Sequence, residues 1–337
     1  MKRIGILLGV LLLAAAVFLA VWAMIPRETQ PEPPALMFRY ADNQPKGYPT
    51  TQAADYFAEL VEKRTDGKIV IRVFPDSVLG NEISVFRQMQ FGGIDFARLS
   101  VSTLSEFVPE ISILQLPYLF EDAEHMWRVL DGEIGKQLLE SIRPFGLAGM
   151  SWFDAGSRNI YTKTPVTSLD DIKRLRIRVQ ESDFLSRMVS LWGAVPVKIS
   201  YESVYSALQT GKIDGAENNW PSYEATGHYE VAPYYLLDAH SRLPEAQLIS
   251  QNALEEISAL GDGYVEIVLQ CAAESAQYER ELWKEREARS EAVVRESGCI
   301  VTELSEEEMK RFQDAVAPIY EEFTGDRAEM IRRIQED

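Results

Sequence analysis

The sequence predicts an α/β protein built as two similar lobes with a cleft between them. Its 337 residues leave room for two domains with substantial cores. Strand-like and helix-like segments alternate through residues 36–99 and again through residues 170–218, as in a mainly parallel sheet covered by helices. A short pattern of helix end, glycine and Ile-Asp occurs once in each half, at 90–95 and 209–214. This placement indicates two similarly built lobes.

In the first half, the pattern predicts three strands joined by two helices. The helices show apolar residues on one face, from Ala54 to Val61 in the first, and Asp66-Gly67 ends that helix. Ile69, Ile71 and Val73 alternate with polar residues, which is typical of a half-buried strand. The expected elements are strands at 36–41, 68–74 and 94–99 and helices at 51–64 and 82–90.

The second half repeats this order and then becomes helical. Gly193 and Gly211 each follow a predicted helix, and Ser200 is a favourable N-cap for the second of these helices. The charges of the long helix around Cys271 are interpreted as a solvated face. The expected elements are strands at 175–180, 195–199 and 299–304, helices at 182–192 and 200–210, the long helix, and a helix at 305–320 whose residues Ser305 to Glu308 form a capping box.

The N-terminus has the layout of an export signal. Lys2 and Arg3 precede an apolar run at 4–25, and 21–23 is a possible cleavage site. We expect residues 1–25 to be a signal peptide or an N-terminal anchor, and residues 26–35 to be an extended spacer. In either case the rest of the chain faces an extracytoplasmic space, the periplasm or the cell surface.

Composition excludes several classes of function. The formal net charge of -18 argues against a nucleic-acid or anionic-lipid partner, which would require a basic face. Three histidines and two cysteines leave little material for a metal site, and we expect no metal and no cofactor. Cys271 and Cys299 lie near opposite ends of the long helix, about 40 Å apart if the helix is continuous, so a disulfide is not expected.

Catalytic motifs are missing from the sequence. It contains no serine or cysteine nucleophile motif, no glycine-rich phosphate loop, no CxxC and no HExxH. The three histidines, His125, His228 and His240, are interpreted as structural residues. We therefore expect no catalytic residues.

Arginines inside apolar strands point to anion binding. Arg176 and Arg178 share one face of the strand at 175–180, and Arg158 and Arg98 lie among small or apolar neighbours. Guanidinium groups suit a planar, two-pronged grip on a carboxylate. A strand arginine is as often a surface residue or an ion-pair partner as it is a ligand-binding residue. This alternative stays open at each position. Without a catalytic base, the arrangement favours capture of an acid over its turnover.

These residues occur within stretches that resemble a known family, the extracytoplasmic solute receptors of tripartite ATP-independent periplasmic (TRAP) transporters, in the dicarboxylate-receptor (DctP-type) group. The similar stretches are "YADNQPKGYPTTQAADYFAELVEKRTDGKIVI", "GGIDFARLS", "LPYLFEDAEHMWRVLDGEIGKQLL", "DIKRLRIRVQES", "YESVYSALQTGKIDGAENNWPSYEATGHYEVA" and "LDAHSRLPE". Together they cover nearly all of residues 36–250.

The resemblance implies a two-lobed, periplasmic-binding-protein-like α/β fold with mixed sheets and flanking helices. It further implies a ligand cleft between the lobes, crossing strands, and a long helix that spans the hinge. On this basis we expect lobe I at 36–155 plus about 244–283, and lobe II at 156–243 plus about 284–337.

The resemblance also implies the site. Arg178 falls where the family's arginine makes the bidentate carboxylate contact, Arg158 where a second arginine binds, and Asn218 where an asparagine binds the ligand. Ser100 stands where sialic-acid-type members carry a glutamate, which argues against sialic acid and makes Arg98 a candidate second contact. Polar and aromatic residues near these positions suit a sugar. The full set of predicted ligand-binding residues is Arg178, Arg158, Asn218, Arg98, Ser100, Asn219, Trp220, Asn43, Gln44 and Tyr223.

One of these residues has an alternative role, and the neighbouring Glu217 is not expected to bind the ligand. Trp220 is equally well interpreted as a packing residue beneath the cleft. Glu217 is expected to be a structural ion partner, because it would repel a bound carboxylate. Asn219 and Trp220 are the residues expected to decide which acid is bound.

The function that the resemblance implies is capture of a small organic acid anion, a sugar acid such as a hexuronate or a C4-dicarboxylate. The receptor, expected to be a monomer, would close on the acid and deliver it to a TRAP membrane permease. One alternative is a sensory ligand-binding module anchored through residues 4–25. The other is an exported enzyme acting on an acid sugar, which would depend on His125 or His240.

Overall fold

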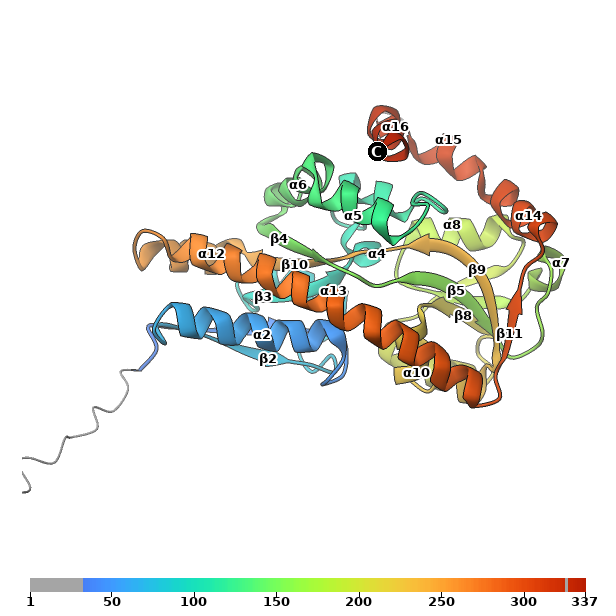
Figure 1. Ribbon diagram of the computed structural model, residues 1–337, viewed down its shortest axis with the longest axis horizontal. Coiled ribbons are helices and arrows are strands. Elements are labelled where there is room, and N and C mark those ends of the chain that lie inside the picture. The colour runs from blue at the N-terminus through green and yellow to red at the C-terminus, as the bar shows by residue number, and fades with distance from the viewer. Residues whose placement is uncertain (1–32, 325–326) are drawn as a thin grey trace, which may run out of the picture. The chain divides into compact units, whose positions relative to one another are not determined.

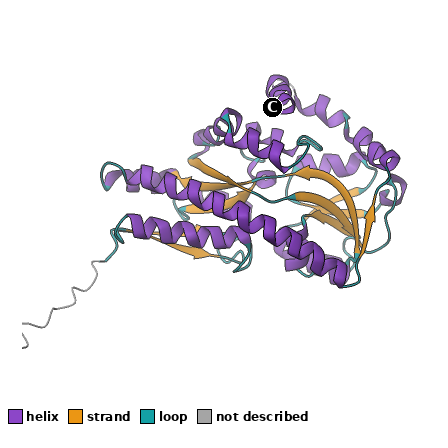
Figure 2. Cartoon of the chain, viewed as in Figure 1, coloured by secondary structure: helices purple, strands orange, loops and turns teal. Residues whose placement is uncertain are grey.

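The computed structural model describes residues 33–324 and 327–337, whose strands form two mixed sheets (Figures 1 and 2). The predicted signal or anchor at 1–25 lies outside these residues. Sheet A has the strand order β2-β1-β3-β10-β4, and sheet B has the order β11-β9-β5-β8-β6-β7. The strands of sheet A are β1 (Leu36–Ala41), β2 (Ile69–Phe74), β3 (Phe96–Ser100), β4 (Leu147–Phe153) and β10 (Glu245–Ser250).

In sheet A, strands β2, β1 and β3 are parallel, as expected for strands connected by helices. The connecting helices are α2 (Pro49–Arg64) and α3 (Glu82–Gln90). Strand β10 comes from far along the chain and inserts antiparallel between β3 and β4. This late strand makes the sheet mixed.

Sheet B combines a parallel part with an antiparallel part. Its strands are β5 (Ser157–Thr162), β6 (Arg176–Val179), β7 (Val195–Lys198), β8 (Gly215–Asn218), β9 (Tyr234–Arg242) and β11 (Ile300–Glu303). Strands β7, β6 and β8 are parallel, β5 is antiparallel to both β8 and β9, and β11 is parallel to β9. The two Ile-Asp patterns open β3 and β8, which are interior strands of their sheets.

Helices cover the faces of both sheets. The remaining ones are α4 (Val101–Leu104), α5 (Ala123–Asp131), α6 (Glu133–Glu140), α7 (Leu169–Ile172), α8 (Asp183–Leu191), α9 (Val204–Gln209), α10 (Trp220–Ala225), α11 (His228–Val231), α12 (Gln251–Ala259), α13 (Tyr264–Glu296), α14 (Glu306–Val316), α15 (Pro318–Thr324) and α16 (Ala328–Glu336), with 3₁₀ turns η1 (Pro109–Gln115), η2 (Arg143–Phe145) and η3 (Tyr201–Ser203). None of the helices in the described residues combines the length and apolar character needed to cross a bilayer.

The long helix α13 serves both lobes. It lies beside α2 and β4 of the sheet A lobe and beside α10 of the sheet B lobe (Figure 1). Its buried residues join four separate clusters: Cys271 packs with the β1 and β2 side chains, Ala276 with Phe153, Trp283 with Tyr48, and Val294 with the β8 and β9 side chains. Both cysteines are free thiols. Together with the crossings between β4 and β5 and between β9 and β10, α13 connects the lobes of the predicted two-lobed fold.

Several boundaries differ from the sequence prediction for local reasons. The helix expected at 305–320 is two helices, α14 and α15, because Pro318 cannot donate the backbone hydrogen bond that would continue the first. The segment after Ser200 begins as the 3₁₀ turn η3 before α9. Strands β5, β9 and β10 were not delineated from their local pattern.

The C-terminal helices return to the sheet A lobe. Nε2 of His125, on α5, lies 2.7 Å from the Ile334 carbonyl of α16. The Tyr320 hydroxyl donates to the Pro117 carbonyl at 2.9 Å. Residues 284–337 were predicted as part of lobe II, and α16 packs against α5, which was predicted as part of lobe I. The lobe boundaries themselves stay a prediction.

Candidate functional site

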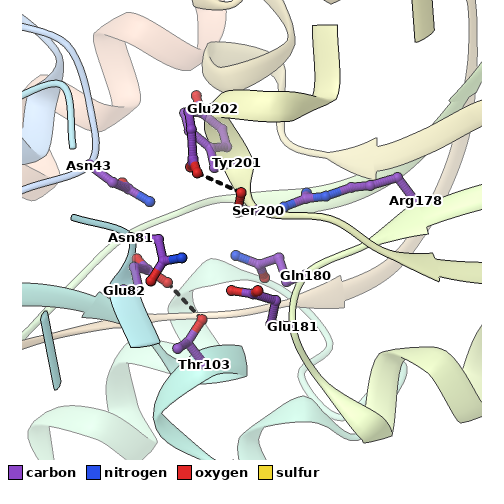
Figure 3. A pocket seen from close by; sticks show the side chains of 10 residues that line it. All are labelled: Asn43, Asn81, Glu82, Thr103, Arg178, Gln180, Glu181, Ser200, Tyr201 and Glu202. Atoms are coloured by element: carbon purple, nitrogen blue, oxygen red, sulfur yellow. Dashed lines mark hydrogen bonds between the residues drawn. The ribbon is translucent and has the colours of Figure 1, made fainter. Parts of the chain in front are cut away.

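A cleft opens where the parallel strands of the two sheets end (Figure 3). Asn43 follows β1 and Thr103 follows β3, whereas Gln180 follows β6 and Ser200 follows β7. In open α/β sheets ligands collect beyond the carboxyl ends of strands, because backbone and loop donors converge there. The lining residues are Asn43, Asn81, Glu82, Thr103, Arg178, Gln180, Glu181, Ser200, Tyr201 and Glu202.

Arg178 is the cation of this cleft. Its side chain is 2% exposed and points from β6 into the cleft (Figure 3). Nε donates to the Ile199 carbonyl at 2.8 Å, which fixes the plane of the guanidinium. Its two terminal nitrogens have no hydrogen-bond partner or carboxylate among the described residues. Burial lowers the pKa of Arg178, and the charge of Glu217, which forms no ion pair with it, only partly opposes this effect.

Arg158, on β5, has a carboxylate partner. Nε donates to Glu217 Oε2 at 2.5 Å, and the two terminal nitrogens donate to the Asn218 side chain and the Glu217 carbonyl, both at 3.1 Å. Burial opposes the charge of Arg158, but Glu217 raises its pKa overall. Glu217 is therefore a structural ion partner, as the sequence predicted. The amide nitrogen of Asn218 has no partner among the described residues, so it can still donate to a ligand.

A histidine extends this buried ion pair. Nε2 of His240, on β9, lies 3.6 Å from Glu217 Oε2, and Nδ1 lies 2.7 Å from Asp238 Oδ2. Burial lowers the pKa of His240, but the two carboxylates outweigh it and raise the value to about 9. Burial raises the pKa of Glu217, but Arg158 and His240 lower it to about 2. These charges hold Arg158 in place behind the cleft.

Arg98, on β3, is surrounded by carboxylates. Its terminal nitrogens donate to Glu82 at 2.8 Å and to Glu245 at 3.1 Å, and also to Asp42 and Asn43. The side chain is 1% exposed, and the pKa is raised well above its usual value by these anions, although burial opposes them. Arg98 thus holds the cleft wall together and has no terminal nitrogen left over for a ligand.

Short polar contacts join the two sides of the cleft. Gln180 Nε2 donates to Ser100 Oγ at 3.2 Å, and the Tyr201 hydroxyl donates to Gln44 Oε1 at 3.0 Å. Tyr48 and Ser222 join the two lobes at 3.0 Å. Ser100 and Gln44, both predicted as ligand-binding residues, make contacts from one lobe to the other.

Of the ten predicted ligand-binding residues, only Arg178 and Asn43 belong to the cleft lining, and Asn219, Trp220 and Tyr223 are among the eight that do not. Asn219 caps α10 by accepting from the Ser222 amide and donates to the Ala155 carbonyl, which uses both ends of its side chain. The Trp220 ring stacks on Tyr235 at 3.8 Å and borders a separate hollow beside α13. Tyr223 is buried and donates to the Ala232 carbonyl at 2.6 Å. The stacking of Trp220 on Tyr235 agrees with the interpretation of Trp220 as a packing residue.

The cleft contains residues that sequence reasoning did not select. Glu82, Gln180, Glu181 and Tyr201 were not predicted as ligand-binding residues, although Gln180 ends a predicted strand and Glu181 and Tyr201 come within two residues of the end of one. Their position immediately after a parallel strand was an available signal. Glu82 opens a helix, and nothing in its local pattern distinguishes it from any acidic residue at a helix N-terminus.

Gly215 allows the close approach of β8 and β5, which carry Asn218 and Arg158. A Cβ added to Gly215 would lie 2.5 Å from the Tyr161 carbonyl oxygen and 2.7 Å from the Thr162 methyl group. Because the nearer atom belongs to the backbone, it cannot rotate away. We expect Gly215→Ala to lower the free energy of unfolding by about 1–3 kcal/mol, measured by urea denaturation.

Gly211→Ala is the matched control for this change. Gly211 has a positive φ of 72°, and its added Cβ would meet nothing closer than 3.8 Å. That variant should lose only about 1 kcal/mol, from backbone strain alone. Equal losses in the two variants would contradict the steric argument for Gly215.

The protein has two lobes, a cleft where their strands end, and in that cleft a buried arginine that forms no ion pair among the described residues. These features define the class of two-lobed solute-binding receptors. The family model described as bacterial extracellular solute-binding protein, family 7 (DctP) matches residues 40–326. The chain belongs to this family, whose members are extracytoplasmic receptors that bind small organic acid anions and work with a membrane permease.

Solved structures and a curated relative agree with this assignment. A TRAP periplasmic solute-binding protein from a Bradyrhizobium species, in complex with α/β-D-galacturonate, is 39% identical and has a TM-score of 0.85; the match covers 89% of this chain and 99% of that one. One from Chromohalobacter salexigens with bound D-glucuronate is 33% identical, with a TM-score of 0.84 and the same coverage. The C4-dicarboxylate-binding periplasmic protein of Rhodobacter capsulatus is 29% identical over 94% of this chain and 93% of its own length.

Proposed function

We propose that this receptor captures a hexuronate by its carboxylate and passes it to a TRAP permease. The observation that supports this most is Arg178, a buried guanidinium that lies in the cleft without an anionic partner. Burying a charge is costly unless it is paired, so the closed cleft is most stable when an anion occupies it. A ligand carboxylate would accept two hydrogen bonds from the terminal nitrogens of Arg178.

The other arginines have different roles in this proposal. Arg158 presents a positive charge near Arg178, but its nitrogens are already bonded to Glu217 and Asn218. It adds electrostatic attraction and positions the Asn218 amide as a second donor. Arg98 binds only carboxylates and an amide of the chain itself, so we assign it to the architecture of the cleft and not to the ligand.

The cleft suits a ligand with several hydroxyl groups. Asn43, Asn81, Thr103, Gln180 and Ser200 place amides and hydroxyls around it, which match sugar hydroxyls as donors and acceptors. The half-buried Tyr201 provides the aromatic ring that Trp220 was expected to provide. The galacturonate and glucuronate complexes of the related proteins support a hexuronate over other organic acids.

We propose binding without turnover. His125 is buried, with one ring nitrogen accepting from the Glu121 amide and the other beside the Ile334 carbonyl. His240 lies between two carboxylates, and neither histidine lines the cleft. We also propose that the receptor is a monomer. We propose that residues 1–25 direct its export and are cleaved, in preference to remaining as an anchor. A retained anchor would favour the sensory alternative.

Calorimetry and thermal unfolding with a small set of acids test this function. We expect D-galacturonate or D-glucuronate to bind and to raise the melting temperature, because ligand at a hundred times Kd adds about 2.7 kcal/mol to the stability of the folded state. The bound sugar acid should be recovered chemically unchanged. Failure of both hexuronates to bind would contradict the proposal, and conversion of the sugar would favour the enzyme alternative.

A further inference from the structure

We propose that three carboxylates of the cleft lining, Glu82, Glu181 and Glu202 (the acidic wall), restrict this receptor to acids with a single carboxylate. This inference rests on the proposed function and specifies the class of acid that the same cleft accepts. It assigns to the wall the rejection of dicarboxylates whose second carboxylate lies away from Arg178.

The balance of charge in the cleft lining is the first observation. The lining contains three carboxylates and a single guanidinium (Figure 3). One ligand carboxylate is matched by Arg178. A second one would find only anions and neutral amides or hydroxyls within the lining, and like charges placed together without a cation repel strongly where water is excluded.

Glu82 is held in place as an anion. Its Oε1 accepts from Arg98 at 2.8 Å and from the Ser100 amide at 3.1 Å, and its Oε2 accepts from the Thr103 hydroxyl at 2.8 Å. These three donors fix the carboxylate against the cleft. It cannot move aside for a second anion as an exposed glutamate would.

Arg98 does not neutralise the wall, because it is shared. Besides Glu82, it contacts Asp42 and Glu245 within the same buried group. Burial raises the pKa of Glu245 to about 8. Even without a charge on Glu245, Asp42 and Glu82 share one guanidinium, so the group keeps a net negative charge beside the cleft.

Glu181 interacts with charges of both signs in the cleft. Burial raises its pKa, and the negative charges of Glu202 and Glu82 raise it further, although Arg178 opposes them. A ligand carboxylate placed beside Glu181 would meet the same anions. A hydroxyl group at that place would instead donate a hydrogen bond to them, so the wall selects hydroxyl groups at the far end of the ligand.

Binding of D-galacturonate and galactarate by calorimetry tests the proposal. Both are six-carbon sugar acids, and galactarate carries a second carboxylate. We expect the wild-type protein to prefer galacturonate, and Glu181→Gln and Glu82→Gln each to reduce the ratio of the two affinities by about tenfold. The two acids also differ in shape, but this difference affects the affinity ratio in every variant alike. The change in the ratio between variants therefore measures the effect of the charge.

Two controls make the result decisive. Glu133→Gln on α6 removes one exposed negative charge outside the cleft lining and should leave the ratio unchanged. Because Glu82 is buried in an ion-pair network, the half-buried Glu181 provides a second variant whose folding is at less risk. An unchanged ratio in both cleft variants, or a change of equal size in Glu133→Gln, would overturn the proposal. Wild-type protein that binds neither acid would instead refute the proposed function.

Discussion

Replacing Arg178 by methionine is expected to weaken hexuronate binding by about 2–5 kcal/mol, which is at least about thirtyfold in Kd. The change removes the only cation of the cleft lining that lacks an anionic partner among the described residues. The ligand carboxylate would then be buried without a charge-assisted hydrogen bond. Isothermal titration calorimetry with D-galacturonate measures the loss.

The same variant should be at least as stable as the wild type without ligand. Burial disfavours the charge of Arg178 in the folded protein, and methionine removes that cost while keeping much of the volume. Arg176→Met is the matched control on the same strand, because Arg176 is half-exposed and paired with Asp214 at 2.7 Å. That control should bind normally. Normal binding by Arg178→Met would exclude Arg178 as the carboxylate contact.

Stability should fall by about 3 kcal/mol between pH 6.5 and pH 9 because of His240. The folded state raises the pKa of this histidine from its usual 6.5 to about 9, since Asp238 and Glu217 favour its charged form. A raised pKa means that the folded state binds the proton more tightly than the unfolded state. The stabilisation is therefore complete below pH 6.5 and is lost as the pH rises through 9.

Urea unfolding of the wild type and His240→Gln at several pH values isolates this effect. Glu245, whose pKa burial raises to about 8, also reduces stability as the pH rises from 4.5 to 8, so the difference between the two proteins is the informative quantity. That difference should shrink from pH 6 to pH 9.5. Glu217, whose pKa Arg158 and His240 lower to about 2 in the wild type, contributes the opposite trend only below pH 4.5, outside the range compared. A difference independent of pH above 6.5 would contradict the assignment.

Local pattern predicted most of the individual elements in the two sheets. Strand β1 and helix α3 have the predicted bounds, because alternation and the glycine stop are properties of the segment itself. Strands β9 and β10 depend on partners far away in the chain, and neither shows clean alternation, because β10 is buried throughout and β9 buries polar residues such as Asp238 and His240. Sequence pattern therefore did not delimit them.

The roles of the strand arginines could not be distinguished from the sequence. Arg98 and Arg178 occupy equivalent places in similar strands, yet Arg98 pairs with three carboxylates and Arg178 forms no ion pair among the described residues. The partners of Arg98 are 16, 56 and 147 residues away. Only the tertiary fold brings them together, so the number of carboxylates around an arginine is not visible in its neighbours.

Trp220 illustrates the same limit for an aromatic residue. A tryptophan beside polar residues is typical of sugar-binding sites, but here Tyr235 from β9 covers its ring. Tyr201 lines the cleft instead, at the end of β7. The arrangement of strand ends predicts such positions better than residue type alone.

The late insertion of β10 determines the order in which the chain can fold. Among the described residues β4 pairs in sheet A with β10 alone, and β10 follows β4 by about ninety residues that include most of sheet B. The first lobe therefore cannot close its sheet until the chain has passed through the second and come back. Both lobes must mature together, which keeps an incomplete receptor from presenting one finished half of its binding cleft.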